Sequence, residues 1–404
     1  MLLKLAWRNV WRNRLRSLVI MLAIIVGVAA SIFLLSFMIG MVRSYINNTI
    51  QNEISHIQIH DKSYKEDYEV KYFFTDVDKK ITAIQSQENV EAVTSRSIAN
   101  GIISSAKASR GVFIRGVDPI RELSVTHLDE KIIEGEFLSE AKKNPIVISK
   151  RLAEKLKLKL RKKLVLRFQD VNGEIVDGAF RIIGIFKTDK NMFDDGNVFV
   201  RQKDLNKLLS ISEGAHEMAV FLKSETQLQK DSTAIQAVAP NLLVETFEQI
   251  SPDVRLFREQ IKISSTFIMF IIMLALIFGI INTMLMAVLE CYRELGMLMA
   301  VGMNKAKIFV MILLETLLIG LISAPIGMLI GYLLVLMTRR SGIDLSAYSD
   351  GMAEFGMSSM VYPSLESGVY WQLAVAVLLT TVLGALYPAY KAIKLKPVEA
   401  IRKI

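Results

Sequence analysis

The chain has 404 residues, of which 52% are hydrophobic, and its formal net charge is +9. This length allows two or three domains, and the single cysteine, Cys291, excludes an intrachain disulfide framework. The positive charge lies mostly outside residues 43–262, which hold 34 Lys and Arg against 32 Asp and Glu. Of the other 15 basic residues, 13 form three clusters beside apolar runs. This placement indicates membrane topology and not a nucleic-acid-binding face.

Residues 1–17 are predicted to form an amphipathic helix lying in the membrane interface. Apolar and aromatic side chains share one helical face, and basic side chains spaced four apart share another. This pattern favours contact of the basic face with anionic lipid headgroups; the alternative is a flanking charge cluster without a helix. The two sets are Leu3, Trp7, Val10 and Trp11, and Lys4, Arg8, Arg12 and Arg16.

Four apolar runs are predicted to span the membrane as helices, because each is long enough to cross the bilayer core. Gly27 and Ser31 lie in the middle of the first run, where small side chains permit close helix packing. Glu315 lies inside the third run, and an interfacial or helix-pairing role is favoured over a proton relay. The runs are 18–42, 263–289, 308–338 and 369–390.

Residues 43–262 are predicted to form a large α+β domain between the first two spans. The pattern suggests two subdomains, one built from both ends of the segment and one inserted within it, followed by a helical stalk after Pro252 that continues into the second span. Strand-like runs lie at 55–60, 101–105, 112–117, 146–149, 164–168, 175–186, 197–201, 217–222 and 242–246, and helix-like runs at 76–87, 150–160 and 225–238.

The second and third spans are joined by 290–307, ECYRELGMLMAVGMNKAK, a short, charged and methionine-rich segment. Glu290 and Glu294 are one helical turn apart, and the methionines offer flexible apolar surface that suits an irregular groove on a partner. One hypothesis is an ordinary amphipathic connector, and the other is a docking helix for a cytoplasmic partner. A loop at 339–368 and a basic tail at 391–404 complete the predicted organisation.

The basic clusters predict the orientation of the chain. With both termini in the cytoplasm, all three clusters face the cytoplasm, and only Arg339 and Arg340 lie outside near a short loop. The 43–262 domain is then extracytoplasmic, and the expected location is the cell inner membrane. The basic clusters comprise Lys4, Arg8, Arg12, Arg14 and Arg16, then Arg293, Lys305 and Lys307, then Lys391, Lys394, Lys396, Arg402 and Lys403.

Motifs for catalysis are missing from these 404 residues. No Gly-Lys dipeptide occurs, so there is no Walker A pattern, and there is no HExxH, CxxC or GxSxG. His56 and His60 could share one strand face, but no third ligand is evident, so a solvated strand is favoured over a metal site. We therefore expect no catalytic residue, no metal and no cofactor bound by this chain.

The chain resembles the FtsX-like permeases, which are membrane subunits of ABC transporters of the macrolide-exporter (MacB-type) and lipoprotein-releasing (LolC/LolE-like) kinds. The similarity covers nearly the whole chain, and 55–67 is similar to the lipoprotein-releasing branch. The segments that carry the resemblance are 5–17 (LAWRNVWRNRLRS), 290–303 (ECYRELGMLMAVGM) and 387–401 (YPAYKAIKLKPVEAI), with 116–119, 134–138 and 181–186 in the middle region.

The resemblance implies partners and site residues. Two copies of a cytoplasmic ATPase would hold ATP and Mg²⁺, and a second permease, identical or related, would pair through the first two spans. The implied cargo is a lipoprotein taken from the membrane, with handover to a periplasmic chaperone left open. The implied ATPase-docking residues are Glu290, Arg293, Glu294, Gly296, Met297, Ala300, Gly302 and Met303, and the implied substrate or dimer seam is Gly27, Ser31, Phe267 and Phe270.

Two other functions compete with lipoprotein extraction. A permease of this architecture could transmit motion for drug or peptide efflux, or regulate a periplasmic partner such as a cell-wall hydrolase. A third hypothesis, from a different functional class, is a signalling receptor that transports no substrate. In the docking hypothesis Glu294 pairs with a basic residue of the ATPase, while Gly296 and Gly302 allow close approach.

Overall fold

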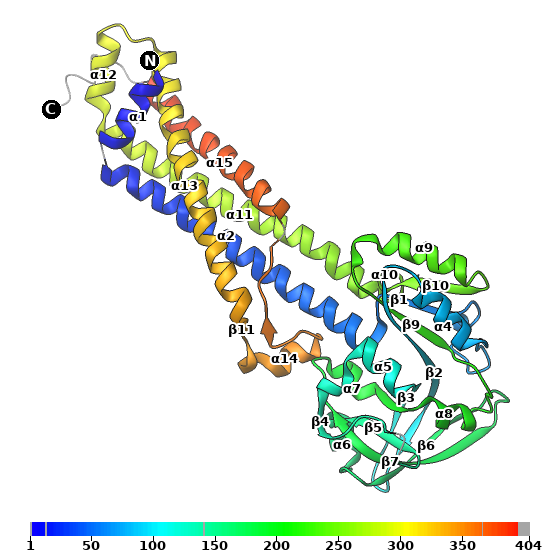
Figure 1. Cartoon of the computed structure of the whole chain (residues 1–404). Coiled ribbons are helices and arrows are strands. Elements are labelled where there is room, and N and C mark those ends of the chain that lie inside the picture. Colours follow the sequence, from blue (N-terminus) through cyan, green and yellow to red (C-terminus); the bar gives the residue numbers. More distant parts are fainter. Residues whose placement is uncertain (1, 13, 140–141, 366, 395–404) are drawn as a thin grey trace. The chain divides into compact units, whose positions relative to one another are not determined.

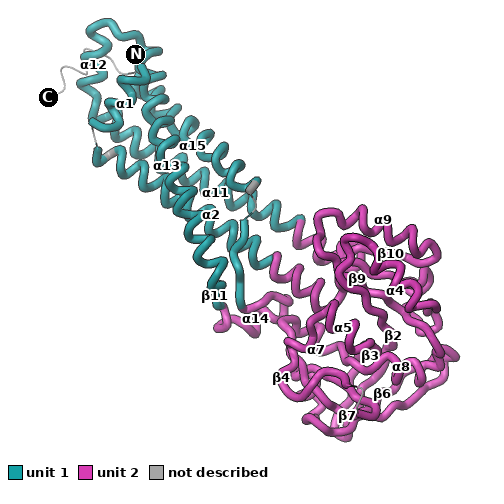
Figure 2. Tube along the Cα trace, viewed as in Figure 1, with its two compact units in different colours: residues 1–42, 259–344, 360–404 teal, residues 43–258, 345–359 magenta. Residues whose placement is uncertain are grey.

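The computed structural model describes residues 2–12, 14–139, 142–365 and 367–394, so most of the predicted tail at 391–404 lies outside the described residues. The chain divides into two compact units (Figure 2). Unit 1 comprises 1–42, 259–344 and 360–404, and unit 2 comprises 43–258 and 345–359.

Unit 1 is helical, and four of its helices are long and apolar enough to cross a membrane, as predicted. The candidate spans are Ser17–Ile54, Pro252–Glu290, Lys305–Ser341 and Gly368–Ile393, and each contains one of the four apolar runs (Figure 1). The helices that contribute to this unit are α1 Leu2–Arg12, α2 Arg14–Thr49, α11 Pro252–Glu290, α12 Tyr292–Ala300, α13 Lys305–Ser341 and α15 Ser367–Ile393.

Glycines bring α13 close to two neighbouring helices. A Cβ atom added at Gly327 would lie 2.9 Å from the carbonyl oxygen of Ile25 in α2, and one added at Gly331 would lie 2.9 Å from Ile32 Cβ. Two turns nearer the start of α13, a Cβ at Gly320 would collide with Thr381 Cγ2 of α15. Lipid is as apolar as these side chains, so close van der Waals contact of this kind holds the helices together.

Replacing Gly320 with Val should lower the thermal stability of the full chain in detergent, because the branched side chain must push α15 away from α13. Overpacking of a well-packed interior typically costs about 1–3 kcal/mol. Gly279→Val in α11 is the matched control, since nothing lies within 4 Å of a Cβ at that glycine. Equal melting temperatures for both variants would contradict this account of the α13–α15 contact.

The N-terminal helix α1 packs differently from the prediction. Ala6 and Val10 are buried, whereas Trp7 and Trp11 are exposed and meet edge to face with their ring centroids 6.0 Å apart. Val10 therefore does not share the exposed apolar face. It belongs to the core of unit 1, with Ile308 and Ile312 of α13, because α1 lies against α13.

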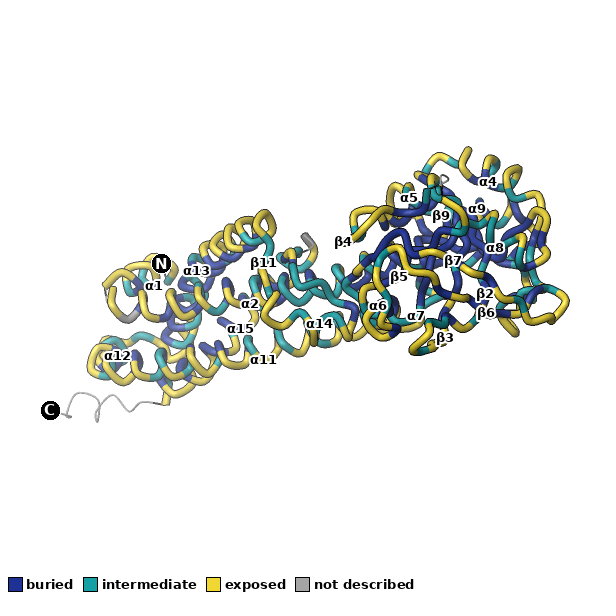
Figure 3. Tube along the Cα trace, turned by 90° about the horizontal axis from the view of Figure 1, so that it is seen from below, coloured by how far each residue is buried: buried dark blue, intermediate teal, exposed yellow. Residues whose placement is uncertain are grey.

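Unit 2 contains one 10-stranded mixed sheet with helices (Figure 3 shows its strands largely buried). The strand order is β10-β1-β9-β2-β3-β8-β5-β7-β4, and β6 pairs with β2 and β7. The strands are β1 Ile57–Asp61, β2 Val90–Ser104, β3 Ser109–Val117, β4 Ile132–Gly135, β5 Pro145–Ser149, β6 Lys163–Gln169, β7 Ile175–Phe186, β8 Asn197–Arg201, β9 Glu217–Leu222 and β10 Leu242–Thr246.

Short helices complete unit 2. They are η1 Ile50–Ile54, α3 Tyr64–Asp67, α4 Val77–Gln85, α5 Pro119–Thr126, η2 Leu128–Lys131, α6 Lys150–Leu156, α7 Asn191–Gly196, α8 Gln202–Leu208, η3 Glu225–Gln227, α9 Leu228–Val238, α10 Phe247–Ile250, η4 Ser346–Tyr348 and α14 Ser349–Glu354. The mixed α and β composition predicted for this region is confirmed, and each predicted strand overlaps an observed one.

The strand β2 explains why the two predicted subdomains are not separate units. Its first half, from Val90 to Arg96, pairs with β9, and its second half pairs with β3 and β6. The strands from the two ends of the segment and the strands of the inserted part therefore share one sheet. Alternation of apolar residues predicts strands but not their partners, so this continuity is invisible in sequence.

Local contacts set the ends of two helices of unit 2. The Asp118 carboxylate accepts hydrogen bonds from the backbone N–H groups of Ile120 and Arg121 and caps α5, with proline in its first turn. The helix predicted over 150–160 ends at Leu156, because Lys157 adopts a left-handed conformation with φ of 54°. The strand β4 was not predicted.

The segment predicted as a loop at 339–368 is partly ordered. It holds the strands β11 Ile343–Asp344 and β12 Met360–Val361, which pair with each other, and its middle part, 345–359, belongs to unit 2. There a Cβ added at Gly356 would lie 3.2 Å from both Lys190 and Tyr45. Lys190 itself forms an ion pair with Glu53, with 2.6 Å between Nζ and Oε2.

Candidate docking site

The helix α12 is shorter than the predicted 290–307 segment and ends at a glycine turn. The N–H of Met303 donates to the Leu298 carbonyl and that of Gly302 to the Met299 carbonyl, which is the Schellman pattern. Gly302 adopts φ of +99°, a conformation that favours glycine, and Asn304 then caps α13 by accepting from the N–H of Ala306. The turn separates α12 from α13 within a few residues.

One side of α12 is buried and the other is exposed. Leu295 and Gly296 are buried, and Leu295 is part of the core of unit 1. The side chains of Arg293 and Ala300 are exposed, Met297 is 54% exposed, and Val301, which follows the helix, is 90% exposed. An exposed methionine and valine beside a charged residue form the kind of surface that a protein partner covers.

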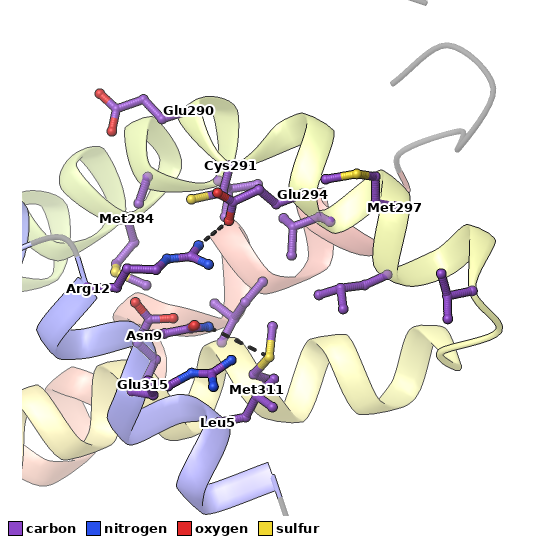
Figure 4. Close-up of a pocket in the computed structure, with 17 residues that line it drawn as sticks. Leu5, Asn9, Arg12, Met284, Glu290, Cys291, Glu294, Met297, Met311 and Glu315 are labelled. Carbon is purple, nitrogen blue, oxygen red and sulfur yellow. Dashed lines mark hydrogen bonds and ion pairs between the residues drawn. The ribbon is translucent and has the colours of Figure 1, made fainter. Parts of the chain in front are cut away.

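A cavity of about 740 Å³ lies beside α12, between α1, α11 and α13 (Figure 4). Arg12 of α1 reaches across it and forms an ion pair with Glu294 of α12, and Asn9 Nδ2 lies 3.8 Å from Met311 Sδ. Glu315 of α13 is buried and also lines the cavity. Figure 4 shows Glu294 directed at Arg12, and Glu290 is also among the residues that line the cavity. The site is therefore a charged, partly apolar recess without an arrangement for covalent chemistry.

The structure gives four of the predicted docking residues a position or contact within this chain, and their contact with an ATPase stays a prediction. Glu294 forms an ion pair with Arg12 of its own chain. Gly296 is buried within unit 1. A Cβ at Gly302 would meet no atom within 4 Å. The backbone conformation of Gly302 at the end of α12 is enough to explain why glycine occurs there. Met303 is half-buried and packs against the core of unit 1.

The remaining predicted docking residues are on the exposed side. Glu290, Arg293, Met297 and Ala300 are all exposed. The ATPase contact that the resemblance assigns to them stays a prediction. Val301 was not predicted, although an apolar residue next to a turn glycine in a short connector between two spans could have suggested it.

The four residues predicted for the dimer or substrate seam fall into two groups, one packed inside the chain and one exposed. A Cβ added at Gly27 would lie 2.8 Å from Leu276 Cδ2 of α11, and Ser31 is buried with its hydroxyl donating to the Gly27 carbonyl. Both residues therefore pack inside this chain and are not available to a second permease. Phe267 and Phe270 are each 63% exposed, so only they remain candidates for the seam.

Sequence reasoning missed the role of α1 in this site. Arg8, Asn9 and Arg12 line the cavity, whereas the sequence pattern assigned the basic face of this helix to lipid headgroups. Arg12 and Glu294 are 282 positions apart, so no local spacing signals their pairing. Only the folded bundle brings them together.

Two family models match the chain. The MacB-like periplasmic core domain matches residues 17–238, more than half of the chain, and the FtsX-like permease C-terminal domain matches residues 266–397. The first match includes most of unit 2, and the second includes most of α11 and all of α12, α13 and α15.

The chain is also similar to characterised and uncharacterised transport proteins. An uncharacterised ABC transporter permease of Methanocaldococcus jannaschii is 28% identical over 240 residues, which cover 57% of this chain and 56% of that protein. The macrolide export ATP-binding/permease protein MacB of Escherichia coli is 30% identical over 165 residues, covering 38% of this chain and 22% of that protein. The chain thus spans about half, or less, of the length of these relatives.

A solved structure is similar to part of the chain. The periplasmic region of MacB from Actinobacillus actinomycetemcomitans is 11% identical, with a TM-score of 0.37, and the match covers 52% of this chain and 97% of that one. The family assignment rests on the two domain models, whose order along the chain agrees with a large α/β domain between the first and second of four candidate membrane helices. The chain is a multi-pass membrane protein that belongs to the FtsX-like permeases with a MacB-like periplasmic core domain.

Proposed function

We propose that this chain is the membrane-spanning subunit of an ABC transporter and that α12 docks on a separate ATPase in the cytoplasm. The observation that carries the proposal is the exposed surface of α12, on which Arg293 and Met297 both lie. The relatives named as ABC transporter permeases support the same assignment. The ATPase, in two copies, would hold ATP and Mg²⁺, and the permease would work as a homodimer or related heterodimer.

The proposed orientation places both termini and α12 in the cytoplasm and unit 2 outside an inner membrane. The three basic clusters support it through the positive-inside rule. The domain model that matches residues 17–238 is described as periplasmic, which agrees with this orientation. Closure of the ATPase pair would then move α12, and the helices of unit 1 would carry the motion to the far side of the membrane.

The class of cargo is a further proposal, and two observations bear on it. The similarity of 55–67 to the lipoprotein-releasing branch supports extraction of lipoproteins, with a periplasmic chaperone as the acceptor. The relatives named as macrolide export proteins support export of a drug or peptide by transmitted motion, the mode that could also regulate a periplasmic partner such as a cell-wall hydrolase.

The docking proposal predicts loss of copurifying ATPase activity when the exposed face of α12 is changed. We expect Arg293→Glu and Met297→Asp to lower Mg²⁺-dependent ATP hydrolysis in the affinity-purified complex from native membranes by at least tenfold. Breaking one side of a buried charge pair at an interface typically costs about 2–5 kcal/mol, which is more than tenfold in affinity. Glu294→Lys is less suitable because it also breaks the pair with Arg12, and Gly302→Trp because it strains the turn.

Lys307→Glu is the matched control for this experiment. Lys307 is exposed and basic like Arg293, and it lies in the first turn of α13, outside α12. It should retain the hydrolysis of the parent chain, while hydrogen exchange of unit 2 stays unchanged in all three variants. Full activity in both α12 variants, or an equal loss in Lys307→Glu, would return α12 to the role of a simple connector.

A further inference from the structure

A second recess in unit 1, of about 650 Å³, runs along α13 and is bounded by the segment that leads into α15. Half of its lining residues are Met, Leu or Val. Tyr332 of α13 and Tyr370 of α15 also line it, with their rings edge to face and their centroids 6.2 Å apart. Arg339 and Ser364 supply further polar groups.

The recess is open because the lead-in segment follows α2 and not α13. The backbone N–H of Ser364 donates to the Ser36 carbonyl at 3.1 Å. At Gly40 of α2, an added Cβ would lie 2.6 Å from the carbonyl oxygen of Tyr362. These contacts hold 362–364 against α2, so the lead-in segment does not fill the space beside α13.

The length of the recess matches one leaflet of a bilayer. Its lining on α13 extends from Pro325 to Arg339, which at ~1.5 Å per residue is about 21 Å along the helix. One leaflet, with its headgroup region included, is roughly 20–22 Å thick. A chain lying in the recess with its polar end at Arg339 would therefore reach about to the middle of the membrane, where Pro325 lies inside α13.

Two polar groups of this recess have no partner in the described part of the chain. Arg339 is exposed in the last turn of α13 and forms no ion pair with a described residue. The Ser364 hydroxyl is buried and has no hydrogen-bond partner there. A guanidinium binds phosphate oxygens through two parallel hydrogen bonds, which makes Arg339 a fitting headgroup ligand.

We propose that this recess binds one anionic phospholipid, with an acyl chain beside Tyr332 and Tyr370 and the phosphate on Arg339. The site lies on the leaflet opposite the α12 end of α13, because these residues are at the other end of that helix. The competing role of Arg339 is to offset the negative end of the helix dipole. Arg340 has the same charge in the same turn and lines no part of the recess, so it separates the two roles.

Native mass spectrometry of the delipidated full chain tests the proposal with dioleoyl phosphatidylglycerol and dioleoyl phosphatidylcholine, which share their acyl chains. We expect one phosphatidylglycerol to bind at least fivefold more tightly than phosphatidylcholine. Arg339→Gln should abolish this preference, and Arg340→Gln should retain it. Equal affinity for the two lipids, or an equal loss in both variants, would overturn the proposal.

A second pair of variants tests the acyl-chain part of the site. Leu329 lines the recess and Leu334 is exposed on another side of α13. Leu329→Trp should weaken both lipids several-fold, and Leu334→Trp should leave both unchanged; no effect of Leu329→Trp would contradict the site. For the unmodified chain in vesicles, phosphatidylglycerol carrying a diazirine on its acyl chain should label peptides spanning 325–339 or 364–370. Labelling confined to other helices would also reject it. The outcome does not depend on an ATPase partner.

Discussion

Replacing Arg96 with Met should lower the free energy of opening of the unit 2 sheet by about 3–5 kcal/mol, the cost of leaving buried charges without their partner. Arg96 is fully buried in β2 and forms ion pairs with Glu122 of α5 and Glu217 of β9, at 2.8 and 2.7 Å. Without the guanidinium, two buried carboxylates would face each other. Hydrogen exchange of β2 and β9 in the full chain measures the change.

The same arginine connects the sheet to the segment that follows the first span. Its Nη1 donates to the carbonyl of Glu53 in η1 at 3.1 Å, while His60 of β1 lies 3.2 Å from Glu217. Burial would raise the pKa of Glu217, but its hydrogen bond with His60 and the charge of Arg96 hold that pKa below its usual range. The network thus joins β1, β2, β9, α5 and η1 through charge.

Arg167→Met is the matched control for Arg96→Met. Arg167 of β6 also forms a two-point contact with a carboxylate, Asp177 of β7, but both side chains are largely exposed. Exposed pairs of this kind contribute little to stability. If hydrogen exchange changed equally in the two variants, the buried network would not be the main stabilising contact of this region.

Acidification should destabilise unit 2 through His216, with the loss developing between pH 6.5 and about pH 4. His216 is fully buried before β9, and burial lowers the pKa of its imidazole to about 4. Its Nδ1 accepts from the N–H of Ile98, and Nε2 faces the Val70 carbonyl at 2.9 Å, so the neutral Nε2–H form satisfies both partners. Protonation of Nδ1 would place its new N–H against the backbone N–H of Ile98.

The sign and size of the pH effect of His216 on the free energy of unfolding follow from proton linkage. Between about pH 4 and 6.5 the unfolded state binds a proton at this position and the folded state does not, so the free energy of unfolding rises with pH in that window. A shift from 6.5 to about 4 corresponds to roughly 3 kcal/mol at 1.36 kcal/mol per pKa unit. Hydrogen exchange at β2 and β9, recorded from pH 7 to pH 4 and corrected for intrinsic exchange, measures it.

His216→Gln isolates this contribution, because the amide keeps one donor and one acceptor but does not titrate. The comparison with this variant is needed because Asp194 acts on stability in the opposite direction. Burial raises the pKa of Asp194 to about 6. Its contribution to stability is therefore complete below its unfolded pKa and is lost as the pH rises through about 6. The difference between parent and variant should therefore grow on acidification. Parallel pH profiles for the two proteins would contradict the assignment.

The sequence by itself determined which segments form the membrane helices and most of the strands. Long apolar runs can satisfy their backbone groups in lipid only as helices, so the four candidate spans were predictable from composition and length. Period-two alternation likewise located strands such as β7, and the connector motif at 290–303 carried the family resemblance. These are signals that a short window of sequence contains.

Only the tertiary structure decided which side chains meet. The pairing of Arg12 with Glu294, the packing of Gly27 against Leu276 of α11, and the ion pairs of the buried Arg96 join residues far apart in sequence. Amphipathic patterns indicate that a helix has an apolar side but not what covers it, so Arg12 and Val10 were assigned to the wrong neighbours. The recess beside Arg339 arises from packing alone, because the lead-in to α15 is held against α2 and leaves the surface of α13 open.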